Sequence, residues 1–459
     1  MNSLRSSKRR IYLAVLIVNA SAALIFLHAW YRVDPATPSP FQYAQALERS
    51  SSVANASSQW APLALSSCSF AMPEHYAPCL AKKMSHVIHS EELLYPDFEL
   101  RQPYFATDSQ RDVWQKFAQN DPEYRDRAHL VEGWVRYSGQ SGQNYVFHDV
   151  QYTRSFGPDI WSDRACMSKG VSTTSIEPLA ADKMAKAFPN ALIALSPDAN
   201  SFQHFLDRVT HIVVQGSHLY QEMRGNVAVL TGQVGSKTVQ ELWKRMGFPE
   251  NHVVHQHKSI AARRLIFSCR AVLVHPWPSL RLLEVLGVPD RHSTSVQRKK
   301  VLYMSRSAGQ ASNGRWVINE EAVLATIKSV LEERNLGEEM VIFNADSFHT
   351  VDELFSYVSQ NALAIVGPHG GAMINHRWAQ KDTFILEFMT ENRIAMMIHE
   401  EASLLSQTYA AIVVPPPRHD SFDLEINVQH VADLLRRHLG VKGEDPLRKS
   451  YPWKVPELD

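Results

Sequence analysis

A short apolar segment that runs into a glycine-rich turn constrains the fold of this chain more than any other stretch. Residues 362–366 (ALAIV) are apolar and partly β-branched, which predicts a strand buried on both faces. A Gly-Pro pair ends this strand, because proline has no N–H to give to a sheet. Residues 369–371 (HGG) form the turn, and residues 372–378 (AMINHRW) predict a helix.

A strand that passes through glycines into a helix leaves N–H groups without partners at the start of the helix. Together with the helix dipole, these groups favour an anion, and the missing Cβ atoms let a phosphate approach the backbone. The alternative is an ordinary tight turn. An esterase oxyanion hole is excluded because no G-x-S-x-G follows in residues 372–459. The chain also has no G-x-G-x-x-G and no P-loop motif.

The N-terminus predicts a membrane anchor. Four basic residues within 1–10 precede residues 11–31, which carry no charge and would span roughly 30 Å as a helix. Positive charge before the span places residues 1–10 in the cytoplasm and the rest of the chain in the lumen. A cleaved signal peptide is the alternative, but no clear A-x-A site follows the apolar run.

Residues 32–95 are predicted to be a stem, because residues 34–67 are rich in Pro, Ser and Ala and have few large apolar side chains. Asn55 lies in a glycosylation sequon within this stem. The sequon at Asn19 lies inside the predicted anchor and should not be used. The 47 basic and 47 acidic side chains cancel, which argues against nucleic-acid binding through bulk charge.

The four cysteines all follow the anchor, where disulfides can form. The close pair Cys68–Cys79 is the predicted first disulfide, which leaves Cys166–Cys269 as the second. Buried free thiols are the alternative. No CxxC pair is present, so a zinc site is not predicted.

From residue 177 onward, strand-like and helical segments alternate, with a break at residues 287–300. Repeated strand–helix–strand segments predict parallel sheets covered on both faces. The chain is therefore predicted to be an α/β protein with two Rossmann-like domains, residues 96–290 and 291–459, that face a cleft. Ligands of such sheets bind where the strands end.

Three motifs resemble those of glycosyltransferase family 61, which includes plant xylosyltransferases and animal O-linked N-acetylglucosaminyltransferases. The first is residues 200–207 (NSFQHFLD), similar to the family's Asn…His-Phe…Asp segment. The second is Ser305-Arg306 with Arg315 and 319–321 (NEE). The third is residues 367–375 (GPHGGAMIN), in which Gly371 is an extra small residue. The resemblance covers residues 165–415.

The resemblance implies a type II secretory-pathway enzyme of the GT-B arrangement and an inverting reaction on a nucleotide sugar. The chain has no Asp-x-Asp, the usual carboxylate pair for a metal–diphosphate complex. Cationic side chains and helix-end N–H groups must then stabilise the leaving diphosphate, so no metal and no cofactor other than the UDP-sugar co-substrate is expected.

The resemblance and the positions of polar residues at strand ends give a set of candidate site residues. The predicted catalytic residues are Asp207 and His204, either of which would deprotonate the acceptor. The predicted donor-binding residues are Arg306, Arg315, Asn319, His369, Gly370, Gly371, Ala372 and Glu387. Each also has a structural alternative, such as a surface salt bridge for Arg306 or an exposed strand-end carboxylate for Glu387.

His204, Asp207, Arg208 and His211 recur at helical spacing, so they share one helix face that meets either the cleft or solvent. The sequence thus predicts a Golgi or ER glycosyltransferase that moves a sugar, xylose or N-acetylglucosamine, from UDP to a glycan or glycoprotein. A non-catalytic luminal sugar-binding or scaffold protein with the same fold is the alternative.

Overall fold

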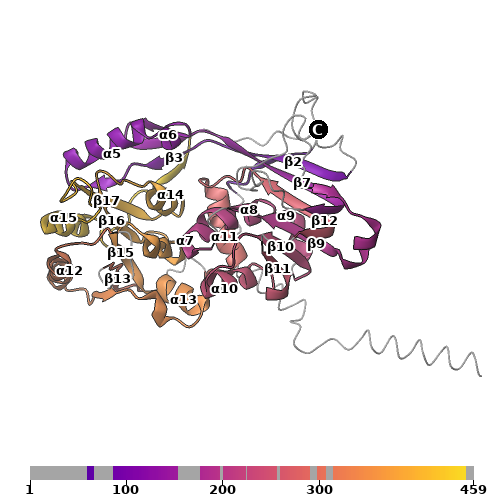
Figure 1. The fold of residues 1–459 in the computed structure, drawn as a ribbon. Coiled ribbons are helices and arrows are strands. Elements are labelled where there is room, and N and C mark those ends of the chain that lie inside the picture. Colours follow the sequence, from indigo (N-terminus) through magenta and orange to yellow (C-terminus); the bar gives the residue numbers. More distant parts are fainter. Residues whose placement is uncertain are drawn as a thin grey trace, which may run out of the picture. The chain divides into compact units, whose positions relative to one another are not determined.

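The computed structural model describes residues 59–66, 86–152, 176–196, 200–223, 225–255, 259–289, 297–306 and 314–450 (Figure 1). The predicted anchor at 11–31, the sequon at Asn55, and Cys68, Cys79 and Cys166 all lie outside these residues. No helix in the described ranges is long and apolar enough to span a membrane.

The first sheet is mixed. Its order is β1-β2-β7-β12-β9-β10-β11, and β8 pairs with β7. Strands β12, β9, β10 and β11 run parallel, as the alternation of strands and helices predicts. The strands are β1 (Leu63–Ser66), β2 (Val87–Tyr95), β7 (Gln140–Tyr152), β8 (Ile176–Pro178), β9 (Phe188–Ala194), β10 (Val227–Thr231), β11 (Val253–His255) and β12 (Ile260–Cys269).

The prediction of a purely parallel sheet is wrong for this half of the chain. β7 pairs antiparallel with β12 and with β2, and β2 pairs antiparallel with β1. No strand is predicted before residue 177, and β1 and β2 lie within residues 32–95, which are predicted to be a stem. β2 alternates between buried and partly exposed positions over much of its length, as a strand with one covered face does.

Helical segments pack on this sheet, with α8 against β9 and β12 and with α11 against α8. The segments are η1 (Ala181–Lys186), α7 (Phe202–His204), η2 (Phe205–Val209), α8 (Thr210–Gln215), α9 (Ser217–Tyr220), η3 (Gln221–Met223), α10 (Lys237–Arg245), η4 (Glu250–His252) and α11 (Pro276–Leu286). The sequence of residues 178–188 (PLAADKMAKAF) predicts a helix, but only the 3₁₀ segment η1 forms there. Thr238 followed by Glu241 predicts a capping box, but Ser236 caps α10 instead, and its Oγ accepts from the N–H of Val239.

The second sheet is wholly parallel, in the order β14-β13-β15-β16-β17-β4. Every residue of β15 and β16 is buried, which confirms the prediction for 362–366 and explains the unbroken apolar run. The strands are β13 (Lys300–Tyr303), β14 (Glu339–Ile342), β15 (Ala362–Pro368), β16 (Phe384–Thr390), β17 (Thr408–Val414) and β4 (Tyr104–Phe105).

Helices connect these strands, and α12 packs against α15. They are α12 (Glu320–Arg334), η5 (Ala345–Ser347), α13 (Val351–Asn361), η6 (Gly371–Trp378), α14 (Met397–Leu404) and α15 (Val428–His438). Thr350 followed by Glu353 predicts a capping box, and Thr350 does cap α13, because its Oγ1 accepts from the N–H of Glu353. The predicted helix at 372–378 is present as the 3₁₀ helix η6.

A third, antiparallel sheet has the order β18-β3-β6-β5. Its strands are β3 (Phe98–Arg101), β5 (Ala128–Val131), β6 (Trp134–Tyr137) and β18 (Leu447–Lys449), and α5 (Asp108–Asn120) and α6 (Pro122–Arg125) lie between β4 and β5 in the sequence. Strand β18 brings the end of the described chain onto β3, and β4 extends the second sheet. Segments near residue 100 therefore join strands from beyond residue 400.

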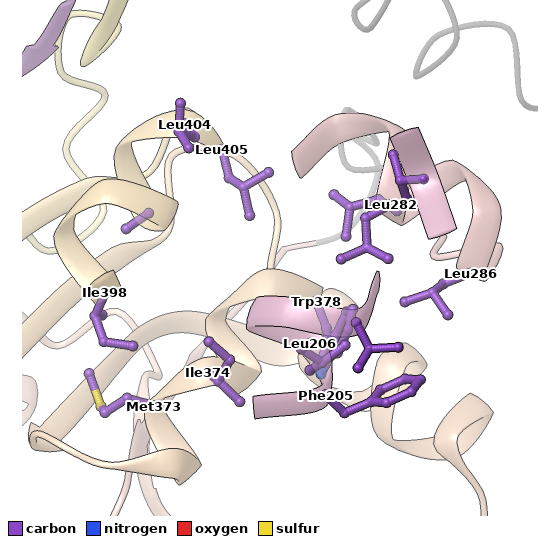
Figure 2. Packing of buried hydrophobic residues seen from close by; sticks show 14 of the residues in the cluster. Phe205, Leu206, Leu282, Leu286, Met373, Ile374, Trp378, Ile398, Leu404 and Leu405 are labelled. Atoms are coloured by element: carbon purple, nitrogen blue, oxygen red, sulfur yellow. The ribbon is translucent and has the colours of Figure 1, made fainter. Parts of the chain in front are cut away.

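The α/β class is confirmed, whereas the division into two GT-B domains stays a prediction. Residues 52–459 group into one compact unit. One buried apolar cluster contains Phe205 and Leu206, Leu282 of α11, Trp378 of η6 and Ile398 of α14 (Figure 2). The two runs of alternating elements therefore share a core in this region.

Candidate functional site

The helical stretch over residues 202–215 carries the predicted acceptor-side residues. Ser201 begins it by accepting from the N–H of His204, at 3.3 Å. The spacing of Phe205, Leu206 and Val209 predicts a helix with one apolar face, and all three residues are buried. The middle of the stretch, η2, is a π-helical turn that contains Asp207. Such turns are rare and are often found at functional sites.

A pocket of about 410 Å³ lies against this helix. The helix contributes Gln203, His204, Asp207, Arg208 and His211, so the predicted polar face does line a cavity. The other charged lining comes from Arg127, Arg377, Glu400 and Glu401. Ala271, Leu273, Val274 and Met397 add apolar surface, so the pocket offers charged, polar and apolar groups to a ligand.

Asp207 is the carboxylate most altered by this pocket. The pKa of Asp207 is raised to about 6. Burial and the charge of Glu401 raise it, while the charges of Arg377 and His204 and a hydrogen bond from Gln203 lower it. A carboxylate with a pKa near 6 can accept a proton at neutral pH and holds it better than an ordinary aspartate does. Asp207 is therefore suited to general-base work.

His211 is not suited to that work. Burial, with the charge of Arg377 nearby, lowers its pKa to about 3, so its imidazole stays neutral at working pH. Its side chain is nearly fully buried. Of the residues on this helix face, Asp207 and His204 remain the two candidates for the base.

An ionic cluster around Arg127 and Glu400, which both line the pocket, forms part of its wall. Glu400 accepts from the Tyr137 hydroxyl at 2.8 Å and pairs with Arg127 at 2.9 Å. The Tyr124 hydroxyl lies 3.1 Å from the Tyr137 hydroxyl. Burial and the charge of Glu400 raise the pKa of Tyr137 well above its usual value, so the phenol keeps its proton. A neutral phenol and a charged guanidinium thus both bind the Glu400 carboxylate and fix its position in the pocket wall.

On the donor side, His369 follows β15 directly. Its Nδ1 lies 2.6 Å from Oε1 of Glu387, and the Tyr409 hydroxyl donates to Oε2 of the same carboxylate. Glu387 is completely buried, and these two neighbours contact both of its oxygens. Its carboxylate therefore holds the imidazole of His369. The alternative of an exposed strand-end carboxylate is wrong for Glu387, because the residue is buried, and its role in donor binding stays untested. Because Nδ1 faces Glu387, Nε2 is the ring nitrogen left for a ligand.

The turn glycines leave space for neighbouring side chains. A Cβ on Gly370 would lie 2.3 Å from Nη1 of Arg306, so the guanidinium occupies the space of a missing side chain. A Cβ on Gly371 would lie 3.3 Å from Oε1 of Gln203, which lines the pocket. The turn is thus adjacent both to an arginine and to the pocket. No side chain caps η6, which begins with Gly371 followed by Ala372.

Three arginines make the potential beside this turn positive. Burial, and then the charges of Arg306 and Arg393, lower the pKa of Arg315 to about 10, while the charge of Glu387 raises it. Burial and the charge of Arg393 also lower the pKa of Arg306. Arg315 is buried and has a φ of 71°, a conformation that costs a non-glycine residue free energy and is often retained at functional sites. The pKa values are lowered in part because these arginines repel one another, so an anion bound beside them would be stabilised.

Asn319 has a different environment from the one predicted. It precedes α12, but its side chain does not cap that helix. Its Nδ2 donates to the carbonyl of Ile426 at 2.7 Å, and its Oδ1 accepts from the N–H of Ile426 at 2.9 Å. The position of Asn319 just before two glutamates predicts a helix cap, and this prediction is wrong because the amide binds the backbone of Ile426 instead. A donor-binding role for Asn319 stays untested.

Sequence reasoning missed Arg377, Arg393, Tyr409 and the Glu400–Glu401 pair. For Arg377 the sequence contains one signal, which is a charged residue within the apolar helix predicted at 372–378. A charged side chain in such a helix is buried only when it has partners, so this residue could have been predicted to form an ion pair. The sequence contains no comparable signal for Arg127, Glu400 and Tyr137, because these residues are far apart in the chain.

Cys269 is fully buried and disulfide-bonded, while its predicted partner Cys166 lies outside the described residues. No cluster of three or more His, Cys, Asp or Glu that could hold a metal occurs in the described part of the chain.

Comparison with known proteins gives one family. A family model described as glycosyltransferase 61 matches residues 202–386, which include Asp207, Arg306 and the glycine turn. It confirms the resemblance drawn from the three motifs. No curated protein matches the chain. A solved structure of a mutant flavo di-iron protein from Thermotoga maritima is similar over 51% of this chain and 52% of that one, at 12% identity and a TM-score of 0.22. The chain spans about half of that protein, and a likeness this low indicates nothing about function.

Proposed function

Because a family model described as glycosyltransferase 61 matches residues 202–386, we propose that the protein is an inverting glycosyltransferase that acts on a UDP-sugar. The donor sugar is xylose or N-acetylglucosamine, and the acceptor is a glycan or glycoprotein. One observation carries the proposal: a carboxylate with a raised pKa, Asp207, lines a pocket that also contacts the glycine turn through Gln203.

On the acceptor side, a sugar hydroxyl enters the pocket and Asp207 takes its proton. The oxygen attacks the anomeric carbon from the side opposite UDP, the bond from that carbon to the diphosphate oxygen breaks, and UDP leaves with the electron pair. A base contributes most when its pKa lies near working pH, which favours Asp207. His204, one turn earlier, is the alternative base.

On the donor side, Arg306, Arg315 and the N–H groups of the turn stabilise the charge that builds on the leaving diphosphate. His369 offers its Nε2 to the donor, and its ring is held in orientation by the Glu387 carboxylate, which also accepts from the Tyr409 hydroxyl. Preorganised donors of this kind lower the barrier because they need no rearrangement during the reaction.

A UDP-release assay with a panel of nucleotide sugars and a broad set of glycan acceptors tests this function. We expect release with at least one donor, and faster release when an acceptor is present. Folded protein that turns over no donor, with or without acceptor, would instead support the non-catalytic sugar-binding alternative.

Metal independence is expected from the absence of an Asp-x-Asp pair and from the arginines beside the turn. Activity should survive EDTA, because cationic side chains and not a metal stabilise the diphosphate. The measurement is UDP release before and after chelation. Complete loss of activity that manganese restores would contradict this account of the leaving group.

We further propose that the protein is a type II membrane protein of the Golgi or ER, with two Rossmann-like domains of the GT-B type in the lumen. The basic residues before the uncharged segment at 11–31 support this orientation. We expect glycosidase to shift the full-length protein once and Asn55→Gln to abolish the shift. Digestion of the C-terminus by protease added to intact microsomes would contradict a luminal domain.

A further inference from the structure

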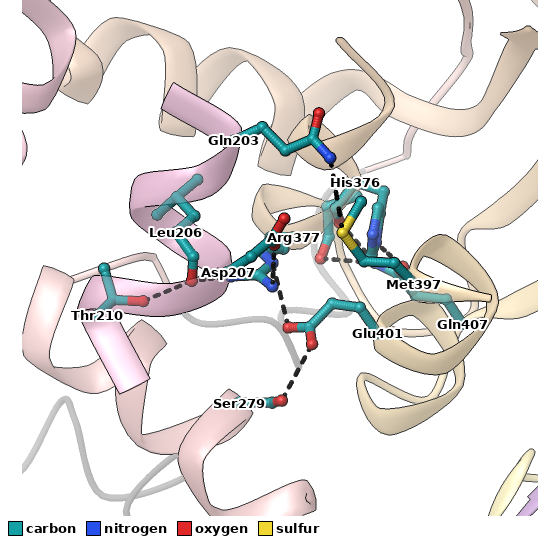
Figure 3. Close-up of polar contacts among 11 residues, drawn as sticks. Gln203, Leu206, Asp207, Thr210, Ser279, His376, Arg377, Met397, Glu401 and Gln407 are labelled. Carbon is teal, nitrogen blue, oxygen red and sulfur yellow. Dashed lines mark hydrogen bonds and ion pairs between the residues drawn. The ribbon is translucent and has the colours of Figure 1, made fainter. Parts of the chain in front are cut away.

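A buried arginine connects the glycine turn to the pocket carboxylate. Arg377 lies near the end of η6, the helix that begins at Gly371, and is only 2% exposed. Its Nη2 lies 3.1 Å from Oδ1 of Asp207, and its Nη1 donates to the carbonyl of Leu206 at 3.1 Å (Figure 3). The guanidinium therefore contacts both the side chain of Asp207 and the backbone of the π-helical turn that carries it.

A second carboxylate holds the other side of this arginine. Oε1 of Glu401 in α14 lies 3.3 Å from Nε of Arg377, and Oε2 of Glu401 accepts from the Ser279 hydroxyl at 3.1 Å (Figure 3). Glu401 is itself 4% exposed. Two carboxylates thus share one guanidinium in a buried place, where an unpaired charge would be costly.

We propose that Arg377 and Glu401 are positioning residues of the acceptor site, which fix the direction of the Asp207 carboxylate and set its proton affinity. This rests on the proposed role of Asp207 as the base. The planar guanidinium suits the task because it can meet Asp207, Leu206 and Glu401 in three directions at once, which an ammonium on a flexible stem cannot reproduce. The position of Arg377 on η6 also joins the base to the donor-side turn through one helix.

The charges around Asp207 act in opposite senses. Besides Arg377 and Glu401, the titratable and charged groups facing the pocket are His204, Arg208 and His211 on its own helix, Glu400 on α14, and Arg127. Glu401 raises the pKa of Asp207 and Arg377 lowers it. Removal of either charge should therefore move the ionisation of Asp207 in a different direction.

The test is the pH dependence of kcat/KM for UDP release in three variants of the full chain. In Arg377→Met, the limb at acid pH should move up by about one pH unit, because the cation that favours ionised Asp207 is gone. In Glu401→Gln, the same limb should move to lower pH. Arg377→Lys should leave the limb near its wild-type position but lower kcat roughly tenfold to 100-fold, because a misdirected base is inefficient.

The matched control is Glu338→Gln. Glu338 is a carboxylate held by Arg334 at 2.7 Å, its side chain is 6% exposed like that of Glu401, and it does not line the pocket. The acid limb of the kcat/KM profile of Glu338→Gln should stay at its wild-type position. The proposal would be overturned if Arg377→Met and Glu401→Gln fold and their acid limbs stay in place or both move in the same direction. If Arg377→Met fails to fold, Glu401→Gln decides by the position of its limb and Arg377→Lys by its kcat, and an unmoved limb in the first with an unchanged kcat in the second would overturn the proposal.

An activity-independent measurement separates this inference from the proposed function. The carboxyl of Asp207 can be titrated by NMR in protein labelled with ¹³C-aspartate, with its signal identified by its loss in Asp207→Asn. Its midpoint should be lower in Glu401→Gln than in wild type, and an unchanged midpoint would refute the positioning role. If wild type turns over no donor but this midpoint shifts, the proposed function fails and the electrostatic coupling stands.

Discussion

Turnover should fall by roughly 100-fold or more in Arg306→Ala, the scale seen when one preorganised stabilising donor is removed. The guanidinium of Arg306 lies against Gly370 beside the donor turn, and its charge gains value as negative charge builds on the leaving oxygen. UDP affinity should also fall. Arg306→Lys should restore activity only in part, because a point charge cannot form a bidentate pair with phosphate. Steady-state UDP release and calorimetric UDP binding measure the two effects.

A pair of glycine variants tests the same contact without removing the charge. Gly370→Ala should weaken UDP binding, because the new Cβ would lie 2.3 Å from Nη1 of Arg306 and displace it. Gly371→Ala should lose much less UDP affinity, because its Cβ would lie 3.3 Å from Oε1 of Gln203 and would not displace Arg306. If Arg306→Ala keeps near-normal turnover and UDP affinity, the clamp assignment is wrong and the role passes to Arg315.

The second large effect is expected for Asp207→Asn, which should lower turnover by roughly 100- to 10,000-fold, the usual contribution of a positioned general base. UDP affinity should stay nearly unchanged, because the pocket of Asp207 belongs to the acceptor side. In wild type, kcat/KM should fall as pH drops through about 6, where Asp207 binds a proton and can no longer act as a base. The measurement is the pH–rate profile of UDP release with saturating donor.

His204→Gln provides the comparison, because His204 is the other candidate base on this helix. If Asp207 is the base, His204→Gln should keep the acid limb of the pH–rate profile and should retain a higher turnover than Asp207→Asn. The assignment would be wrong if Asp207→Asn retained the limb near pH 6 and His204→Gln abolished it. A parallel loss of UDP binding in Asp207→Asn would instead indicate that the pocket is not confined to the acceptor.

The sequence alone determined the local elements around the site. The run at 362–366 is a strand buried on both faces, because an unbroken apolar stretch ending in Gly-Pro fits a central parallel strand. The spacing of Phe205, Leu206 and Val209 predicted a helix whose other face carries Asp207 and His204, and that face lines the pocket. These features depend on residues near one another in the chain, so periodicity and turn chemistry suffice to find them.

What only the tertiary structure decided are the contacts between segments far apart in the sequence. Asp207 and Arg377 are 170 positions apart, and nothing local in either segment indicates the pairing. The same holds for Tyr137 with Glu400, and for the antiparallel strands β2 and β7 that make the first sheet mixed. Proton affinity in the pocket depends on burial and on these distant charges, so the sequence named the carboxylate and the fold set its pKa.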